Sequence, residues 1–456
     1  MTATMSDWIT AWSWSVGRTG LCSPLSRNEV AMETRAGRAM AYRHVRIRDV
    51  YGSVTAIEPV VSGHLPRWAA NVSARRAAWD RPREDPFFLN PVPFVLPPVD
   101  EGEPFHSHNH CPAITWCPNG DLLAAWFSTE REQGTEMTIL ASRLRAGSDV
   151  WDPSSEFFNA PARNLTGTSL FTDGDGTLWH FNGVGPQGTE GWEKLALLVR
   201  TSGDNGATWS PPRPISKGHR YQRRHQVIAG TSITPDGTWL QPCDGTPHGE
   251  GPTAVHVSHD CGHTWRDAGG NVRGIHAGVV GLGGDRLLAF GRGQELDGRM
   301  PLSRSDDLGA SWRHEPSPFP PIGSGQRLVL MRLREGPLLF ASFTDPALRG
   351  EDDTRRGIAL VGRDGRPLTG FGLFAALSFD EGGSWPLRRL MTPSPGRYDG
   401  GAWTGLFHAS PTEAEPMGYL AATQPPDGVI HLLSSRLHYR FNLPWLAEGR
   451  NGAHTW

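Results

Sequence analysis

The chain has 456 residues and a formal net charge of −3 at pH 7. A balance this close to neutral argues against a nucleic acid or a membrane surface as partner, and no apolar run approaches the length of a membrane span. The 55 glycines, 38 prolines and 18 tryptophans favour a many-stranded all-β protein over a helical one.

Residues 1–100 contain few strand signals. We expect them to form an N-terminal extension, partly disordered or packed on a main domain at residues 101–456. Residues 1–39 lack the basic and apolar regions of a secretory signal, so Met40 could be the true start and a cytoplasmic location is expected. Deleting residues 1–39 should then leave melting temperature and activity nearly unchanged.

The main domain repeats a pair of turn residues followed by an apolar run. This pattern is typical of a hairpin turn that leads into a buried strand. In chain order the turns are Asn119-Gly120, Asp175-Gly176, Asp236-Gly237, Gly284-Asp285, Glu335-Gly336 and Asp427-Gly428.

A second repeat, Ser-x-Asp-x-Gly-x-Thr/Ser-Trp, alternates with these turns. In this phrase the Asp can accept backbone N–H groups, the Gly can supply positive φ, and the Trp can bury its ring between neighbouring units. Four copies in register indicate repeated supersecondary units, with an insertion in the fifth unit. The copies span 202–209, 258–265, 305–312 and 378–385, and a degenerate copy spans 142–151.

The four phrases resemble the Asp-boxes of the sialidase (neuraminidase) superfamily, and the resemblance runs from about residue 105 to the C-terminus. It implies an all-β fold, a six-bladed β-propeller with the boxes on turns between the outer strands of each blade. The sixth turn has no box, so we expect the propeller to close by borrowing a strand from the other end of the chain.

The repeats also predict which positions line the mouth of the propeller. The innermost strand of a blade starts at the ligand face and the next strand returns to it, so polar residues at these strand ends should converge. At the strand starts these residues are His110, Asn164, His225, His276, Arg327 and Tyr419. After the returning strands they include Glu130, Arg131, His180, Asp244, Arg292, Asp345 and Ser435.

The resemblance assigns roles to some of these residues. It places the family's nucleophilic tyrosine at Tyr419 and the glutamate that pairs with it at His276. The opening arginine of the family's three-arginine carboxylate site is replaced by His110, which argues against true sialidase specificity. The family's next arginine and its acid match Arg131 and Glu136.

A coherent chemistry follows from this set. A tyrosine hydroxyl, with an ordinary pKa near 10, needs an adjacent base to become a nucleophile, and His276 is the expected base. Glu136 or Glu130 is expected to protonate the leaving oxygen if partial burial raises its pKa. Arginine forks suit a substrate carboxylate. The expected substrate-binding residues are His110, Arg131, Asn164, Arg224, His225, Asp244, Arg292, Arg299 and Arg327.

His106, His108 and His110 alternate along one strand, so their imidazoles share a face. Neighbouring positions on that face are rather far apart for three ligands to close on one ion. We therefore expect these histidines to contact solvent or ligand, and we expect neither a metal nor a cofactor.

Three functions remain open from the sequence. The first is a glycoside hydrolase acting on an anionic sugar or oligosaccharide, with Tyr419 and His276 at its centre. The second is a lyase that cleaves uronic-acid glycans by elimination, with the same two residues moving protons. The third is a non-catalytic glycan-binding propeller. In each case the expected partner is a carbohydrate, with no nucleic acid and no membrane.

Overall fold

The computed structural model describes residues 65–99, 102–215, 224–245, 252–345, 355–361 and 366–448. It also describes a two-residue backbone pair, β1 (Ile47–Arg48) with β2 (Val54–Thr55). The expectations about Met40 and residues 1–39 concern a segment outside the described residues.

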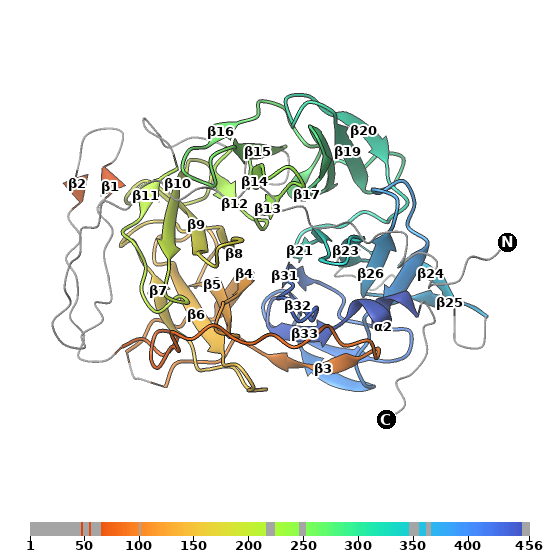
Figure 1. Cartoon of the computed structure of the whole chain (residues 1–456), viewed down its shortest axis with the longest axis horizontal. Coiled ribbons are helices and arrows are strands. Elements are labelled where there is room, and N and C mark those ends of the chain that lie inside the picture. The colour runs from red at the N-terminus through yellow and green to blue at the C-terminus, as the bar shows by residue number, and fades with distance from the viewer. Residues whose placement is uncertain are drawn as a thin grey trace.

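Six antiparallel sheets surround a common centre (Figure 1). In the first five, the first strand in the chain is innermost and the last lies at the periphery. The predicted six-bladed β-propeller is confirmed. The first blade contains β4 (His108–Trp116), β5 (Leu122–Thr129), β6 (Thr138–Leu144) and β7 (Ser155–Phe158). The second blade contains β8 (Thr168–Thr172), β9 (Leu178–Val184), β10 (Ala196–Ser202) and β11 (Arg213–Pro214). The third blade contains β12 (Gln226–Val227) with β13 (Ser232–Ile233), then β14 (Trp239–Asp244), β15 (Thr253–Ser258) and β16 (Arg266–Asp267).

The next two blades have the same order. The fourth blade contains β17 (Ile275–Gly283), β18 (Arg286–Arg292), β19 (Pro301–Ser305) and β20 (Arg313–Pro316). The fifth blade contains β22 (Val329–Arg332), β23 (Leu338–Phe343), β26 (Leu373–Ser378) and β27 (Leu387–Leu390). The insertion in the fifth blade is the hairpin β24 (Ile358–Val361) with β25 (Pro367–Gly370). A second hairpin, β28 (Gly396–Asp399) with β29 (Leu406–Ala409), follows the fifth blade.

The sixth blade contains strands from both ends of the chain. Its inner strands are β31 (Ala421–Thr423), β32 (Ile430–Leu433) and β33 (Leu437–Phe441), and its outer strand is β3 (Phe88–Pro93). β3 pairs with β33 in antiparallel register, so the ring closes with the N-terminal strand on its last blade. The propeller therefore includes residues before the expected boundary at residue 101.

Each Asp-box is a closed set of hydrogen bonds at the turn between the third and fourth strands of its blade. In the box of the second blade, Ser202 Oγ donates to Asp204 Oδ1 at 2.7 Å and accepts the N–H of Gly206 at 2.9 Å. Asp204 also accepts the N–H and the hydroxyl of Thr208. The same bonds recur in the other three boxes, which explains why this phrase is repeated.

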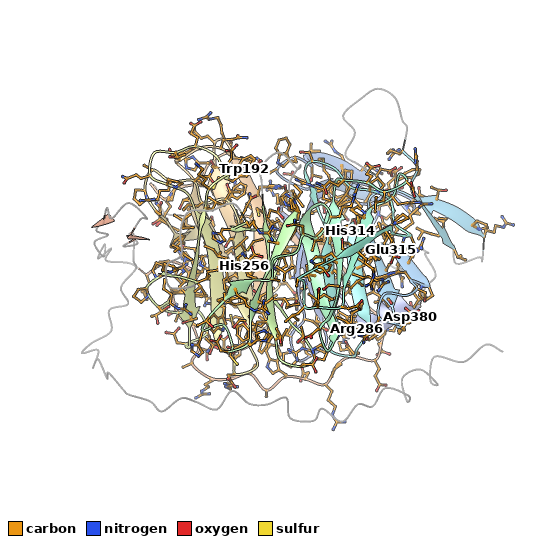
Figure 2. The ribbon with its side chains drawn as sticks, turned by 90° about the horizontal axis from the view of Figure 1, so that it is seen from above. Trp192, His256, Arg286, His314, Glu315 and Asp380 are labelled. Carbon is orange, nitrogen blue, oxygen red and sulfur yellow. The ribbon has the colours of Figure 1, made fainter. Side chains whose placement is uncertain are left out.

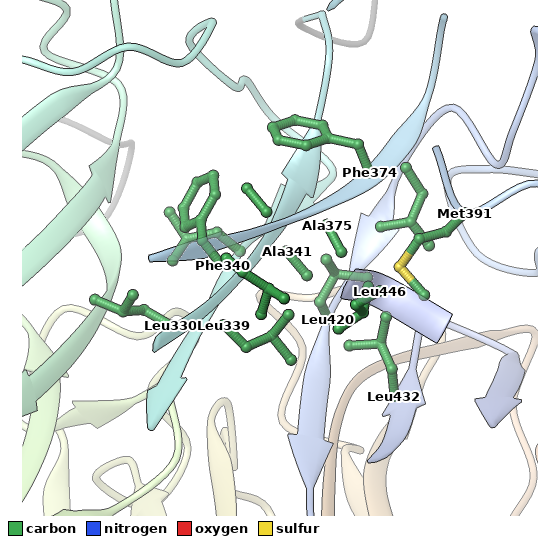
Figure 3. Packing of buried hydrophobic residues seen from close by; sticks show 14 of the residues in the cluster. Leu330, Leu339, Phe340, Ala341, Phe374, Ala375, Met391, Leu420, Leu432 and Leu446 are labelled. Carbon is green, nitrogen blue, oxygen red and sulfur yellow. The ribbon is translucent and has the colours of Figure 1, made fainter. Parts of the chain in front are cut away.

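Apolar side chains fill the space between neighbouring blades. The largest cluster joins the fourth, fifth and sixth blades, and Figure 3 shows Phe340 and Phe374 of the fifth blade beside Leu420 and Leu432 of the sixth. Leu446 of the short helix α2 (Leu443–Ala447) closes the cluster from one end. Each fully buried side chain of this size contributes about 1.5–3 kcal/mol, so the contacts between blades hold the ring together.

The two faces of the ring carry different features. Figure 2 shows Arg286, which follows the inner turn of the fourth blade, and Asp380, which belongs to a box, on the same side of the ring. Trp192, on the loop between β9 and β10, lies on the opposite side. The starts of the innermost strands and the ends of the second strands therefore meet at the face away from the boxes.

Candidate active site

Three side chains from three blades form a hydrogen-bonded relay at this face. The hydroxyl of Tyr419, in the short strand β30 (Gly418–Tyr419), donates to Nε2 of His276 at 2.9 Å. Nδ1 of His276 donates to Asp244 Oδ2. Asp244 ends β14, His276 lies near the start of β17, and all three side chains are buried. The predicted pairing of Tyr419 with His276 is present, and Asp244 extends it to a triad.

His276 occupies a bulge rather than regular strand. The register of β17 against β18 shifts between Ile275 and Gly278, and His276 has a positive φ of 54°. Bulges re-aim a side chain, and a non-glycine residue in this region costs about 1–3 kcal/mol of backbone strain. Asp244 offsets that cost, because its Oδ1 accepts the backbone N–H of His276 at 2.8 Å.

The protonation states at neutral pH make Tyr419 the proton donor of this pair and His276 the acceptor. Burial and the charge of Arg292 lower the pKa of His276 to about 4, although Asp244 opposes them. Burial raises the pKa of Tyr419 to about 12, Arg292 opposes this, and Glu132 adds to the rise. At neutral pH the site therefore holds a neutral imidazole that can accept a proton and a tyrosine that carries one.

Two arginines lie close to the ring of Tyr419, and they differ in what they can bind. Arg292 Nη1 donates to the Tyr419 hydroxyl and to the carbonyl of Gln326, both at 3.0 Å. Its Nε and Nη2 have no hydrogen-bond partner among the described residues. Arg327 lies 5.3 Å from the centre of the Tyr419 ring, but its guanidinium donates to the carbonyls of Leu420, Ile228 and Pro112.

The role expected for Arg327 therefore needs correction. Its donors are used by the backbone of several blades, so it ties the inner strands together beneath the site and leaves no fork for a carboxylate. Of the arginines near Tyr419 in the described part of the chain, Arg292 is the one that keeps donors for a ligand.

The ring of His110 also packs against Tyr419. The two rings are 3.9 Å apart, and Nδ1 of His110 lies 3.1 Å from the hydroxyl of Ser435, which also accepts the N–H of Tyr419. Burial, followed by the charges of His108 and Arg327, lowers the pKa of His110 well below its ordinary value. Its Nε2 is buried without a hydrogen-bond partner among the described residues.

A carboxylate at the rim of the site was missed by the sequence analysis. Glu132 Oε1 accepts hydrogen bonds from His108 Nε2 at 3.1 Å and from Trp403 Nε1 at 3.4 Å. The rings of His108 and His110 are 5.4 Å apart, so Glu132 is connected to Tyr419 through a row of rings. Glu132 lies on a loop, between Arg131 and Gln133. The alternation of side-chain direction along a strand does not extend to a loop, so it could not predict where Glu132 points.

Neither Glu136 nor Glu130 is placed as the sequence analysis expected for the acid that protonates the leaving oxygen. Glu136 Oε1 accepts the Thr129 hydroxyl at 2.6 Å and the backbone N–H of Glu130 at 3.0 Å. Burial acts to raise its pKa, but these hydrogen bonds outweigh it and lower the pKa of Glu136 to about 2. Glu136 is thus an ionised residue that holds its own loop, and the Glu130 side chain is exposed beside His106.

The remaining predicted binding residues make structural contacts. Arg131 pairs with Glu190 at 2.7 Å, and Arg224 pairs with Asp267 at 2.7 Å. Asn164 donates to the carbonyl of Glu132 at 2.7 Å, which supports the loop of that acid. His225 lies 3.2 Å from the carbonyl of Leu195, and Arg299 is exposed on a turn.

Metal ligation has no support in the described residues, because they contain no group of three or more His, Cys, Asp or Glu side chains that could hold an ion. No helix among the described residues has the length and hydropathy needed to cross a bilayer. A cavity of about 280 Å³ lies in the central channel, and the innermost strands line it with apolar residues such as Leu330 and polar residues such as Thr172 and Arg327.

Comparison with known proteins shows which family and which solved structures this architecture resembles. The family model described as a BNR repeat-like domain matches residues 120–432. No curated protein matches the chain. Among solved structures, a protein of unknown function from Dyadobacter fermentans shares 13% identity with a TM-score of 0.51, over 78% of this chain and 99% of that one. The NanB sialidase from Streptococcus pneumoniae shares 12% identity with a TM-score of 0.50, over 78% of this chain and 71% of that one.

At 12–13% identity, the structural likeness to these two proteins shows the fold alone. The fold and the Asp-boxes define a sialidase-like β-propeller, and the predicted resemblance is confirmed at that level. The chain belongs to the family with a BNR repeat-like domain, whose model matches residues 120–432.

Proposed function

We propose that this chain is a glycoside hydrolase that acts on an anionic sugar or oligosaccharide, with Tyr419 as the nucleophile. The observation that carries the proposal is the relay in which Asp244 orients His276 and His276 accepts the hydroxyl of Tyr419. An aspartate that fixes a histidine, which in turn faces a hydroxyl, is the arrangement that activates a weak nucleophile.

In the first step the Tyr419 oxygen attacks the anomeric carbon while its proton passes to His276 Nε2. The bond from that carbon to the leaving oxygen breaks, and the leaving oxygen takes a proton. In the second step water attacks the same carbon, Tyr419 leaves, and His276 returns the proton to the tyrosine oxygen. The sum is one water added to one glycosidic bond.

Glu132 is the group we assign to protonate the leaving oxygen. Its Oε1 is held by His108 and Trp403, and the proposal requires its Oε2 to carry the proton when substrate is bound. In the second step the resulting carboxylate takes a proton from the attacking water. Arg292, with free donors beside the Tyr419 hydroxyl, supplies the positive charge for an acidic group of the sugar.

Elimination is the second candidate, and the position of Arg292 favours it. A guanidinium that neutralises a uronate carboxylate makes the neighbouring C–H more acidic, and Tyr419 backed by His276 could remove that proton. Tyr419 would first pass its own proton to His276. A proton returned through this pair would leave with the departing oxygen as a hydroxyl, so no water is consumed and a double bond remains in the sugar.

A panel of sialosides and uronic-acid oligosaccharides, digested with the purified protein, separates these functions. The proposal expects new reducing ends without ultraviolet absorbance from an unsaturated uronate, and it expects Tyr419→Phe to abolish turnover while ligand binding persists. Absorbance that rises with each new end would show elimination. Binding without any new ends across the panel would show a non-catalytic glycan-binding propeller.

A further inference from the structure

A fully buried carboxyl group, Glu415, lies four residues before Tyr419. Its Oε2 accepts the hydroxyl of Tyr439 at 2.8 Å, and its Oε1 is buried without a hydrogen-bond partner among the described residues. Within the same part of the chain no basic side chain pairs with Glu415, and the nearby Arg436 pairs with Asp399 instead. A charge buried without a partner is costly, so this position favours the neutral acid.

The surroundings of Glu415 place its ionisation in mildly alkaline solution. Burial raises the pKa of Glu415 to about 8, the hydroxyls of Tyr439 and Ser434 oppose this rise, and Asp399 adds to it. Burial and Glu415 itself raise the pKa of Tyr439 well above its ordinary value, with Tyr398 adding to this. Tyr439 therefore keeps its proton in the range where Glu415 loses its own.

One wall of this buried pocket is the hairpin β28–β29. A Cβ atom at Gly400, at the end of β28, would lie 2.6 Å from Glu415 Oε1, so the hairpin closes directly over the carboxyl group. The absence of a side chain at Gly400 permits this close approach. The hydroxyl of Thr404, in the same hairpin, donates to the carbonyl of Met417 at 2.8 Å. The hairpin thus contacts the chain at Glu415 and again two residues later.

The backbone between Glu415 and Tyr419 is also tied to the site. The side-chain amide of Gln326 donates to the carbonyl of Pro416 at 3.0 Å, while the carbonyl of Gln326 accepts Arg292 Nη1 at 3.0 Å. Arg292 Nη1 in turn donates to the Tyr419 hydroxyl. A displacement at Glu415 therefore reaches the nucleophile along the chain and through these hydrogen bonds.

We propose that Glu415 is a positioning residue, which as a neutral acid seats the hairpin β28–β29 against the segment of the nucleophile, and that its ionisation releases the hairpin and sets the alkaline limit of catalysis. The effect on catalysis rests on the proposed function, whereas the release of the hairpin does not. A charged Glu415 needs water. The hairpin is the wall that can admit it, because Leu406 in the hairpin is 64% exposed whereas Tyr439 on the opposite wall is fully buried.

The pH profile of fluoride release from sialyl fluoride and glucuronosyl fluoride tests the effect on catalysis. Fluoride leaves without a proton from Glu132, so the ionisation of Glu132 does not enter the alkaline limb. With a pKa of about 8, about a tenth of Glu415 is neutral at pH 9, and kcat/KM should fall about tenfold between pH 7 and pH 9. Glu415→Gln, which is neutral at every pH, should abolish this fall. Glu413→Gln alters a partly exposed carboxylate of the same connection and is the control that should keep it.

Amide hydrogen exchange measures the hairpin without any turnover. Peptides covering residues 396–409 should exchange faster at pH 9 in the unsubstituted protein than in Glu415→Gln, and equally at pH 6. Tyr439→Phe is the second variant should Glu415→Gln have a lowered melting temperature. It removes a hydroxyl that lowers the pKa of Glu415, so both alkaline changes should move to higher pH.

Equal exchange at pH 9, or the same alkaline fall in Glu415→Gln as in the unsubstituted protein, would overturn the inference. If the protein cleaves neither fluoride at any pH, the proposed function fails, and the exchange comparison still decides whether Glu415 holds the hairpin.

Discussion

At the scale of single residues, the chemistry depends on which nitrogen of His276 carries its proton. Asp244 accepts both the backbone N–H and Nδ1 of His276, so Nε2 is left to accept the proton of Tyr419. This is one tautomer of two, and a carboxylate is the group that enforces it because it has no proton to donate.

Asp244→Asn should therefore lower kcat by roughly 10³–10⁴-fold with little change in substrate binding. The amide NH₂ would donate to Nδ1, move the imidazole proton to Nε2 and remove the base that faces Tyr419. Steady-state kinetics with binding measured separately checks this. Asp345→Asn is the control and should keep kcat, because the Asp345 carboxylate accepts the backbone N–H groups of Arg356 and Gly357 within the fifth blade. A fall in binding that equals the fall in kcat would contradict the relay.

The pH dependence provides a second test of His276. Burial, together with Arg292, lowers its pKa to about 4, so the base form persists well below neutral pH. The acidic limb of the profile for kcat/KM should therefore fall near pH 4 rather than near the ordinary histidine value of 6.5. An acidic limb near 6.5 would show that His276 is not the base.

At the scale of elements, the closing strand β3 holds the sixth blade. Phe88 stacks on Trp445 at 4.5 Å and is 8% exposed, whereas Leu89, next to it on the same strand, is 41% exposed. Phe88→Ala should destabilise the protein by about 3–5 kcal/mol, the usual cost of removing a buried phenylalanine. Leu89→Ala should cost far less. Urea unfolding of both variants measures the difference, and similar losses would show that β3 does not close the ring.

Elements were also the features that the sequence predicted best. Each hairpin turn and each box is a local unit whose hydrogen bonds close within a few residues, as Ser202 and Asp204 illustrate. Counting from these units places Tyr419, His276, Asp244, Arg292 and His110 at strand ends on one face, where the structure brings them together. The phase of a strand tells which way a side chain points.

The phase of a strand does not tell what partner a side chain meets. Arg327 was expected to bind a ligand, but backbone carbonyls of neighbouring blades take up its donors. Glu132 and Trp403 lie on connections outside the repeat, so no count could place them. The bulge at His276 carries positive φ on a non-glycine residue, for which the sequence has no marker.

At the scale of the whole molecule, several histidines are buried in the neutral form. His431 Nδ1 and His438 Nε2 are 2.9 Å apart within the sixth blade, and Trp151 of the first blade donates to His438. Burial, with Arg440 nearby, lowers the pKa of His431 to about 3. Burial also lowers the pKa of His438 well below its ordinary value.

Acid should therefore destabilise the folded state. Because these histidines have lower pKa values folded than unfolded, the unfolded chain binds more protons between about pH 6.5 and pH 3. Their contribution to stability is full above pH 6.5 and is lost as the pH falls through that window. Calorimetric melting temperatures between pH 7 and pH 4 check this, and a melting temperature that rises as the pH falls would contradict it.

The central claim is that Tyr419 forms a covalent bond to the anomeric carbon, and trapping measures it most directly. The protein would be incubated with fluorinated sialyl and glucuronosyl fluorides, whose electron-poor rings slow the second step, and then digested for mass spectrometry. The account predicts a peptide containing Tyr419 that carries the mass of one sugar, absent from Tyr419→Phe and from His276→Ala. Turnover of either sugar with no adduct on that peptide, and with an unsaturated product instead, would contradict the account.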